Sequence, residues 1–125
     1  MATQSGPQPR NWRGARILYA VHGYGRGHAT RSLALLAELR ARHELLVLAG
    51  GDAYQTMASE WPVVRIPTLG FAYGARSGRR SNWHTLRYNL PAALDAWWHG
   101  PVFAMVADAM RAFAPDVVIS DAETW

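Results

Sequence analysis

Two histidines and three glycines crowd the stretch "VHGYGRGHATR", which covers residues 21–31. Imidazole exchanges a proton near neutral pH, so His22 and His28 are candidates for acid–base chemistry. Glycine lets a ligand approach the backbone closely, or simply allows a tight turn. The stretch therefore predicts either a reactive loop or a tightly packed one, and its place in the fold decides between the two.

Apolar runs on both sides of this loop predict strands and helices in alternation. Continuous rather than alternating apolar stretches indicate buried strands, here residues 16–21, 44–49, 63–67 and 116–120. Leucines at helical spacing predict a helix within "TRSLALLAELRARH", residues 30–43. The expected fold class is α/β, a Rossmann-like parallel sheet with helices on both faces.

The segments between these strands differ in character. Asp52 is the expected N-cap of a short helix over residues 53–60, and residues 68–82 form a long loop without periodicity. Residues 83–113 are predicted helical, with Pro91 in a first turn and a break at Gly100–Pro101. Of the adjacent Trp97 and Trp98, at least one is expected to pack in the core.

Composition excludes several kinds of site. All 13 positively charged side chains are arginine, so there is no P-loop lysine and no Schiff-base lysine. There is no cysteine, which excludes disulfides and thiolate metal sites. The formal net charge of +4 favours anionic partners, but charge alone is a weak argument for nucleic acid, and none is expected.

The glycine loop is not a good dinucleotide fingerprint. Gly23 and Gly25 fit the first two positions of G-x-G-x-x-G, but His28 occupies the third and Gly27 comes one residue early. The acidic residue expected at the end of the second strand is also missing, since "VLAGG" stands there. A nicotinamide or flavin cofactor is therefore not expected.

Side chains distant in the sequence are expected to meet at one edge of the sheet. The carboxyl ends of parallel strands lie together, and ligands bind in the crevice outside them. His22 and His28 follow the first strand, and Asp121 follows the fourth. Asp116 lies at the opposite end of its strand. The topology therefore brings the histidines and Asp121 towards one crevice.

Two segments carry a family resemblance. "GYGRGHATR" resembles the glycine loop of GT-B glycosyltransferases, both the G-x-G-G-H-x-x-P loop of the peptidoglycan N-acetylglucosaminyltransferases and the Q-G-H-x-x-P loop of UDP-glycosyltransferases. "FAPDVVISDAETW" is similar to the P-D-x-V-[IV]-x-D segment of the same N-terminal domain. Arg31 stands where these families carry proline, which leaves the subfamily and the acceptor open.

The resemblance implies the N-terminal, acceptor-side half of a two-domain enzyme. Residues 1–14 would be a disordered tail, and residues 15–125 part of a Rossmann-like domain that lacks its C-terminal donor-binding partner. Transfer of a sugar to a hydroxyl needs a base, which makes His28 the base and Asp121 the residue that orients it. His22 is assigned a structural role. The expected substrate-binding residues are Gly23, Gly25, Arg26, Gly27 and Arg31.

Partners follow from the same resemblance. The substrates would be a nucleotide sugar and a hydroxyl acceptor, lipid-linked in some of these families, and transfer would need neither metal nor cofactor. The protein is expected to be cytoplasmic. The loop that carries Arg76, Arg79 and Arg80 is a candidate for contact with the acceptor or with a membrane surface, and a solvated loop is the alternative. Two alternatives stay open: a sugar-nucleotide 2-epimerase of the same architecture, and a non-catalytic module that binds a glycan or lipid headgroup.

Overall fold

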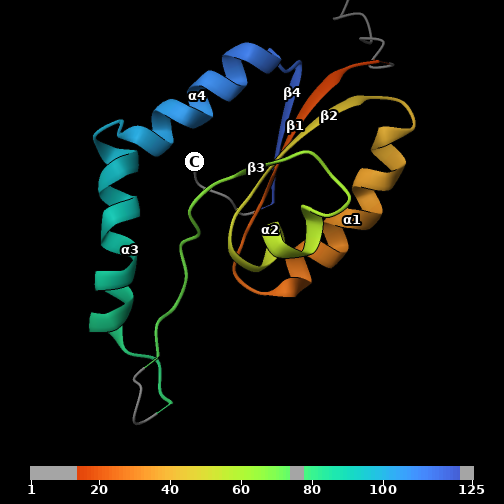
Figure 1. The fold of residues 1–125 in the computed structure, drawn as a ribbon. Helices are drawn as coiled ribbons and strands as arrows, with labels where there is room; N and C mark the ends of the chain where they lie inside the picture. The colour runs from red at the N-terminus through yellow and green to blue at the C-terminus, as the bar shows by residue number, and fades with distance from the viewer. Residues whose placement is uncertain (1–13, 74–77, 122–125) are drawn as a thin grey trace, which may run out of the picture.

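Four parallel strands form the sheet of the computed structural model, which describes residues 14–73 and 78–121 (Figure 1). Their order across the sheet is β3–β2–β1–β4. The strands are β1 (Arg16–Val21), β2 (Glu44–Ala49), β3 (Val63–Arg65) and β4 (Val117–Asp121). Every strand pairing is parallel, which confirms the predicted sheet. β4 is displaced by one residue from its predicted range, so Asp121 is its last residue.

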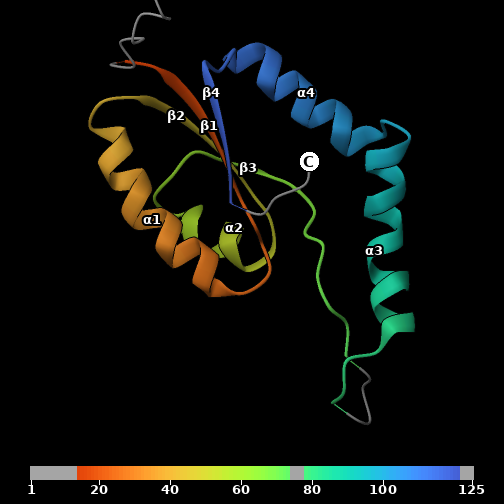
Figure 2. The same cartoon turned by 180° about the vertical axis from the view of Figure 1, so that it is seen from behind.

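Helices cover both faces of this sheet, as predicted. Figures 1 and 2 show α1 and α2 together on one side and α4 on the other. The helices are α1 (Arg26–Arg40), α2 (Gly51–Met57), α3 (Asn82–Trp97) and α4 (Pro101–Phe113). The arrangement confirms a Rossmann-like α/β fold.

The alternation of side chains along β1 builds a core on each face. Tyr19 and Val21 pack with buried residues of α1 and α2, whereas Leu18 and Ala20 pack against Val106 of α4. β1 is a central strand, so both of its faces are covered and a continuous apolar sequence is stable there. The same burial fixes β1 and its pairing with β4, and so places the loop that follows β1.

Two details of the helices differ from the prediction. Gly50, not Asp52, is the N-cap of α2, and no side chain caps that helix. Asp52 lies in the first turn, where its negative charge interacts favourably with the helix dipole. Its backbone N–H donates a hydrogen bond to the Gly23 carbonyl at 2.9 Å. Pro91 lies inside α3 rather than in a first turn, because helix-forming residues on both sides continue the helix past it.

The predicted break at Gly100–Pro101 is confirmed. The side chain of Asp95 in α3 accepts hydrogen bonds from the N–H groups of Val102 and Phe103, at 3.1 and 2.9 Å, and so caps α4. A Cβ on Gly100 would lie 2.4 Å from the same carboxylate. The two helices are therefore joined through one carboxyl group.

A long connection leads from β3 to α3, in agreement with the loop predicted over residues 68–82. Gly70 exchanges two hydrogen bonds with the side chain of Asn89, and the N–H of Ala72 donates to Thr85 Oγ1. These bonds tie the loop to α3. The predicted tail lies outside the described residues apart from Gly14, whose N–H donates to the Arg42 carbonyl.

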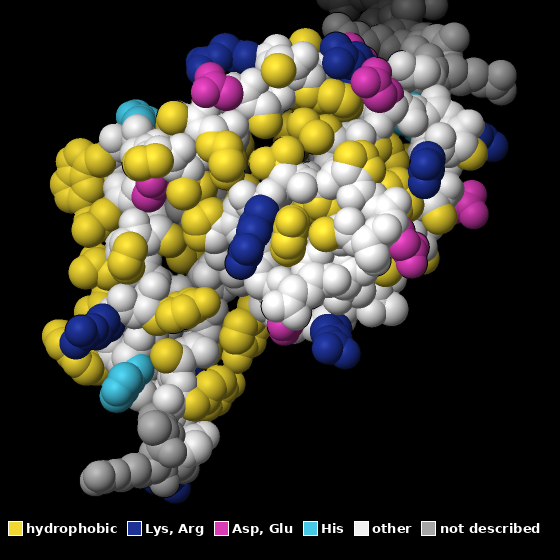
Figure 3. Space-filling model, viewed as in Figure 1, with side chains coloured by type: hydrophobic (Ala, Val, Ile, Leu, Met, Phe, Trp, Pro, Cys, Tyr) yellow, Lys and Arg dark blue, Asp and Glu magenta, His cyan; other side chains and the backbone are white. Residues whose placement is uncertain are grey.

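The outer side of α3 is unusually apolar. Figure 3 shows hydrophobic side chains gathered over α3 and α4. No described residue of α3 is buried, and Trp97 and Trp98 are 78% and 69% exposed, so the expectation that one of them packs in the core is wrong. Within residues 14–73 and 78–121, no helix has the length and hydropathy required to cross a bilayer.

Candidate functional site

One face of α1 meets the end of β4. His28, Arg31 and Ser32 are spaced i, i+3 and i+4, so their side chains project from the same side of the helix. All three reach the carboxylate of Asp121. The helix begins directly after Gly25, whose φ of 83° suits glycine and turns the chain from β1 into α1. Local backbone geometry thus aims this face at Asp121.

The predicted pair of His28 and Asp121 lies within hydrogen-bonding distance. His28 Nδ1 is 3.0 Å from Asp121 Oδ2, although the two residues are 93 positions apart in the sequence. The carboxylate can only accept, so Nδ1 carries the hydrogen in this bond. When the ring is neutral, Nε2 then holds the lone pair, and this is the tautomer that can take a proton from a substrate hydroxyl.

Arg31 binds the same carboxylate. Its Nη2 lies 2.9 and 3.1 Å from the two oxygens of Asp121, and 3.2 Å from His28 Nδ1. Burial alone would raise the pKa of Asp121, but the hydrogen bond from His28 and the bonds and charge of Arg31 outweigh it and hold that pKa below its ordinary value. Asp121 is therefore ionised at neutral pH.

Ser32 completes the surroundings of Asp121. Its hydroxyl is buried between the hydroxyl of Tyr19, at 3.4 Å, and Asp121 Oδ2, at 3.5 Å. Sequence reasoning missed Ser32, and it assigned Arg31 to substrate alone. The sequence does place Arg31 and Ser32 on the same face of the helix as His28, at positions i+3 and i+4. This spacing predicts contact with Asp121 only when it is known that this face of α1 is turned towards β4.

His22 packs beside this group. Its ring meets the ring of His28 edge-on, with centroids 5.3 Å apart, and its backbone N–H donates to the carbonyl of Asp121 at 3.1 Å. That bond continues the pairing of β1 with β4. The arrangement suits the structural role predicted for His22, which stays a prediction.

The three loop glycines have different surroundings. A Cβ on Gly23 would lie 2.0 Å from Thr68 Oγ1 and 2.5 Å from the carbonyl oxygen of Gly50, so close packing within the chain already requires glycine there. Gly25 is required by its positive φ. A Cβ on Gly27 would meet no atom within 4 Å. A Cβ on Gly25 would likewise meet no atom within 4 Å, so the surroundings of Gly25 and Gly27 are open and those of Gly23 are closed.

The two predicted arginines also differ. Arg26 is exposed in the first turn of α1, where backbone N–H groups and the helix dipole favour an anion. Arg31 forms an ion pair with Asp121, so its guanidinium is already bound to a carboxylate of the chain. The structure thus brings His28, Arg31 and Asp121 into one group and leaves Arg26 and Gly27 at its margin.

A cavity of about 760 Å³ opens between the strand ends and the pair α3–α4. Its lining is mainly apolar and includes Tyr88 and Met105 from the helices and Arg65 from β3. Thr68 also lines it, and Thr68 Oγ1 lies against Gly23 of the glycine loop. The cavity therefore adjoins the loop that precedes His28.

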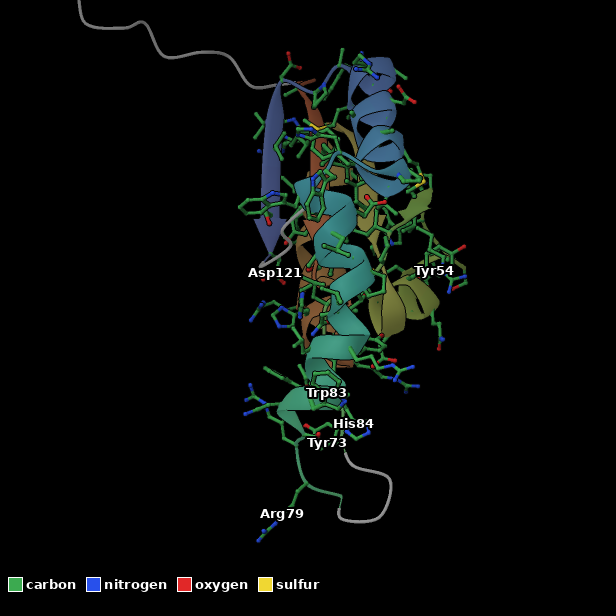
Figure 4. All side chains as sticks on the ribbon, turned by 90° about the vertical axis from the view of Figure 1, so that its left-hand side faces the viewer. Tyr54, Tyr73, Arg79, Trp83, His84 and Asp121 are labelled. Carbon is green, nitrogen blue, oxygen red and sulfur yellow. The ribbon has the colours of Figure 1, made fainter. Side chains whose placement is uncertain are left out.

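The loop that carries Arg79 and Arg80 lies at the N-terminal end of α3. Figure 4 shows Tyr73, Arg79, Trp83 and His84 near that end and Asp121 at the end of β4. The guanidinium of Arg80 stacks on Phe71 at 3.8 Å. Arg76 lies outside the described residues. Among the residues that are described, no three His, Asp or Glu side chains are grouped so that they could hold a metal ion.

Comparison with known proteins gives one family. The family model described as "Glycosyl transferase family 1" matches residues 15–125. No curated protein and no solved structure gives a significant match.

Proposed function

Because the chain belongs to glycosyl transferase family 1, within the GT-B superfamily, we propose that it forms the acceptor-side domain of an enzyme that transfers a sugar from a nucleotide sugar to a hydroxyl. The observation that carries this proposal is the 3.0 Å contact between His28 Nδ1 and Asp121 Oδ2. A base at the carboxyl edge of the sheet, oriented by an ionised carboxylate, is what activation of a hydroxyl requires.

The proposed step moves one proton and one glycosyl group. The acceptor hydroxyl gives its proton to Nε2 of His28 while its oxygen bonds to the anomeric carbon of the donor. The bond from that carbon to the nucleotide diphosphate breaks, and the diphosphate leaves with the electron pair. Asp121 stabilises the imidazolium that forms, because its carboxylate accepts the hydrogen bond from Nδ1.

The donor would be held mainly by a second domain. On this chain, we assign contact with its diphosphate to Arg26 and to the backbone at Gly27, because both lie in the first turn of α1. Close packing accounts for Gly23 and a positive φ for Gly25, so we assign both glycines to the shape of the loop. We propose that the reaction needs neither metal nor cofactor; adding a chelator to the assay tests this.

The acceptor would lie in the cavity beside the glycine loop. Its apolar walls suit an acceptor with an apolar portion, and Arg65 suits a negative charge on it. The exposed apolar side chains of α3, with Arg80 and Arg87 on or near the helix, would let a cytoplasmic enzyme take a lipid-linked acceptor from an anionic membrane surface. Failure to float with anionic vesicles would contradict the membrane contact.

The test of the proposal is a donor screen on the protein with its downstream domain. A panel of nucleotide sugars is incubated with hydroxyl acceptors, and release of nucleoside diphosphate and formation of the glycoside are measured together. We expect both products from the wild type and a large loss in His28→Gln. A 2-epimer of the donor sugar as the product would establish the epimerase instead. Tight binding of a glycan without any turnover would establish a binding module.

A further inference from the structure

Arg31 makes an unusual set of contacts for an exposed side chain. The side chain is 69% exposed, yet its Nη2 reaches both oxygens of Asp121, at 2.9 and 3.1 Å, and lies 3.2 Å from His28 Nδ1. An ion pair this exposed contributes little to the free energy of unfolding. The three contacts therefore matter for orientation more than for stability.

Nδ1 of His28 has one position for hydrogen bonding, and two neighbours compete for it. The guanidinium of Arg31 can only donate, and the ionised carboxylate of Asp121 can only accept. When Asp121 faces Nδ1, that nitrogen carries a hydrogen and Nε2 has the lone pair. When the carboxylate turns away, Nδ1 loses the acceptor of its hydrogen, and the hydrogen moves to Nε2, which is the form that free neutral histidine prefers. Only the first arrangement leaves a base directed at the substrate.

We propose that Arg31 is a positioning residue, which holds the Asp121 carboxylate against Nδ1 of His28 and thereby keeps Nε2 of His28 available as the base. With both oxygens bound to Nη2, the carboxylate cannot rotate about its Cβ–Cγ bond without losing an ion pair. Ser32 and the backbone bond from His22 to Asp121 fix the same residue from the other sides. The role in catalysis rests on the proposed function, whereas control of the His28 tautomer does not.

This role differs from the phosphate contact that the sequence suggested for Arg31. A phosphate ligand would act on the donor, so its loss would raise the KM of the donor and leave kcat nearly unchanged. A positioning residue would act on the base, so its loss would lower kcat with the donor KM unchanged. The two roles therefore predict opposite kinetic signatures.

The decisive variant is Arg31→Met, which keeps the length of the side chain and removes its donors and its charge. Arg31→Lys keeps the charge and a donor. The control is Arg42→Met, since Arg42 is another exposed arginine, beyond the C-terminal end of α1. The first readout is the ring ¹⁵N spectrum of histidine-labelled protein, recorded at a pH where His28 is neutral and assigned by comparison with His28→Gln.

We expect the wild type and Arg42→Met to show His28 with its hydrogen on Nδ1. In Arg31→Met we expect a substantial shift of the His28 population to the form with hydrogen on Nε2, and in Arg31→Lys a smaller one. The loss of turnover should parallel the shift in tautomer. We expect kcat to fall about 10- to 100-fold in Arg31→Met, the usual range for loss of a residue that orients another functional group.

Two results would overturn the proposal. An unchanged tautomer in Arg31→Met would show that Asp121 needs no help in facing Nδ1. An unchanged kcat with a raised donor KM would assign Arg31 to the donor phosphate. If the wild type transfers no sugar but the tautomer still shifts in Arg31→Met, the proposed function fails while Arg31 still controls the tautomer of His28.

Discussion

The hydrogen bond between His28 and Asp121 uses Nδ1 of the imidazole ring, so Nε2 is the ring nitrogen that remains for reaction with a substrate. Nδ1 faces Asp121 at 3.0 Å, and the His28 side chain is 33% exposed, so under the proposed function Nε2 is the nitrogen that takes the proton of the acceptor. The pair lies at the carboxyl edge of a parallel sheet, and the loop that precedes His28 adjoins a cavity. At the scale of residues, we therefore propose that His28 is a base whose tautomer is set by Asp121.

Substitution of the pair should lower turnover rather than donor affinity. We expect His28→Ala to reduce kcat about 10²- to 10⁴-fold, the usual contribution of a general base. Asp121→Asn should cost a comparable or smaller factor, because an amide can present a donor where Nδ1 needs an acceptor. The double variant should fall far short of the product of the two effects, since the residues act as a unit.

His22→Ala is the matched control for this experiment, because the His22 ring packs edge-on against His28 and its backbone bond to Asp121 survives the substitution. It should cost stability and little turnover. If His22→Ala abolishes turnover while His28→Ala leaves it intact, the roles of the two histidines are exchanged. Steady-state kinetics with the donor varied, together with thermal melts, separates these outcomes.

The lowered pKa of Asp121 predicts how stability changes in acid. Its pKa in the folded protein lies below the ordinary value of 3.8, so the unfolded chain binds a proton more readily than the folded one. The stability that this carboxylate contributes is complete well above pH 3.8 and is lost as the pH falls through that value and through the lower folded pKa. Asp121→Asn should remove this part of the acid dependence, which melting temperatures measured from pH 6 down to pH 3 would reveal. Identical slopes in both proteins would contradict the assignment.

At the scale of elements, the glycine loop is built from positions with different tolerances. We expect Gly23→Ala to cost about 1–3 kcal/mol of stability, because its Cβ would overlap Thr68 and Gly50. Gly27→Ala should be neutral or stabilising by up to about 1 kcal/mol, because it meets open space within α1. Chemical denaturation of both variants checks this. A loss of activity in Gly27→Ala without a loss of stability would support contact of Gly27 with a substrate, whereas a destabilised Gly27→Ala would contradict the predicted tolerance.

The elements also show how far the sequence leads. Continuous apolar runs located the strands because both faces of a central strand such as β1 are buried, and that signal is local. Topology placed both histidines and Asp121 at one edge, since strand ends share it, and the family resemblance singled out His28. The bonds of Arg31 could not be predicted, because they depend on which side of α1 faces β4. Proline favours the first turn of a helix, so the sequence predicts that position for Pro91. α3 instead continues through Pro91, because residues on both sides of the proline are helical.

At the scale of the whole molecule, the sheet leaves β4 at its edge. Val118 on this strand is 52% exposed, and α3 and α4 add further exposed apolar side chains. We therefore expect the 125-residue chain on its own to self-associate, since exposed strand edges and apolar patches both favour association. Val118→Lys should weaken the association more than Leu35→Lys, a matched substitution on α1 at a residue 44% exposed. Sedimentation across a range of concentrations measures this. A monomeric wild type, or equal effects of the two substitutions, would contradict the edge as the cause.

The register that joins Ile17 of β1 to Val117 of β4 has a consequence for how the protein acquires its site during synthesis. Local hairpin-like contacts do not exist in a parallel sheet, and the entropy of closing a chain rises with the length enclosed. β1 and β2 enclose a short crossover and can pair early, whereas β1 can meet β4 only after the residues up to Asp121 have left the ribosome. Arg31 and His28 are thus made early, and their carboxylate partner arrives last. Completion of this site reports completion of the four-stranded sheet, so a chain that stalls before β4 pairs has a loop with histidines but no carboxylate to orient His28.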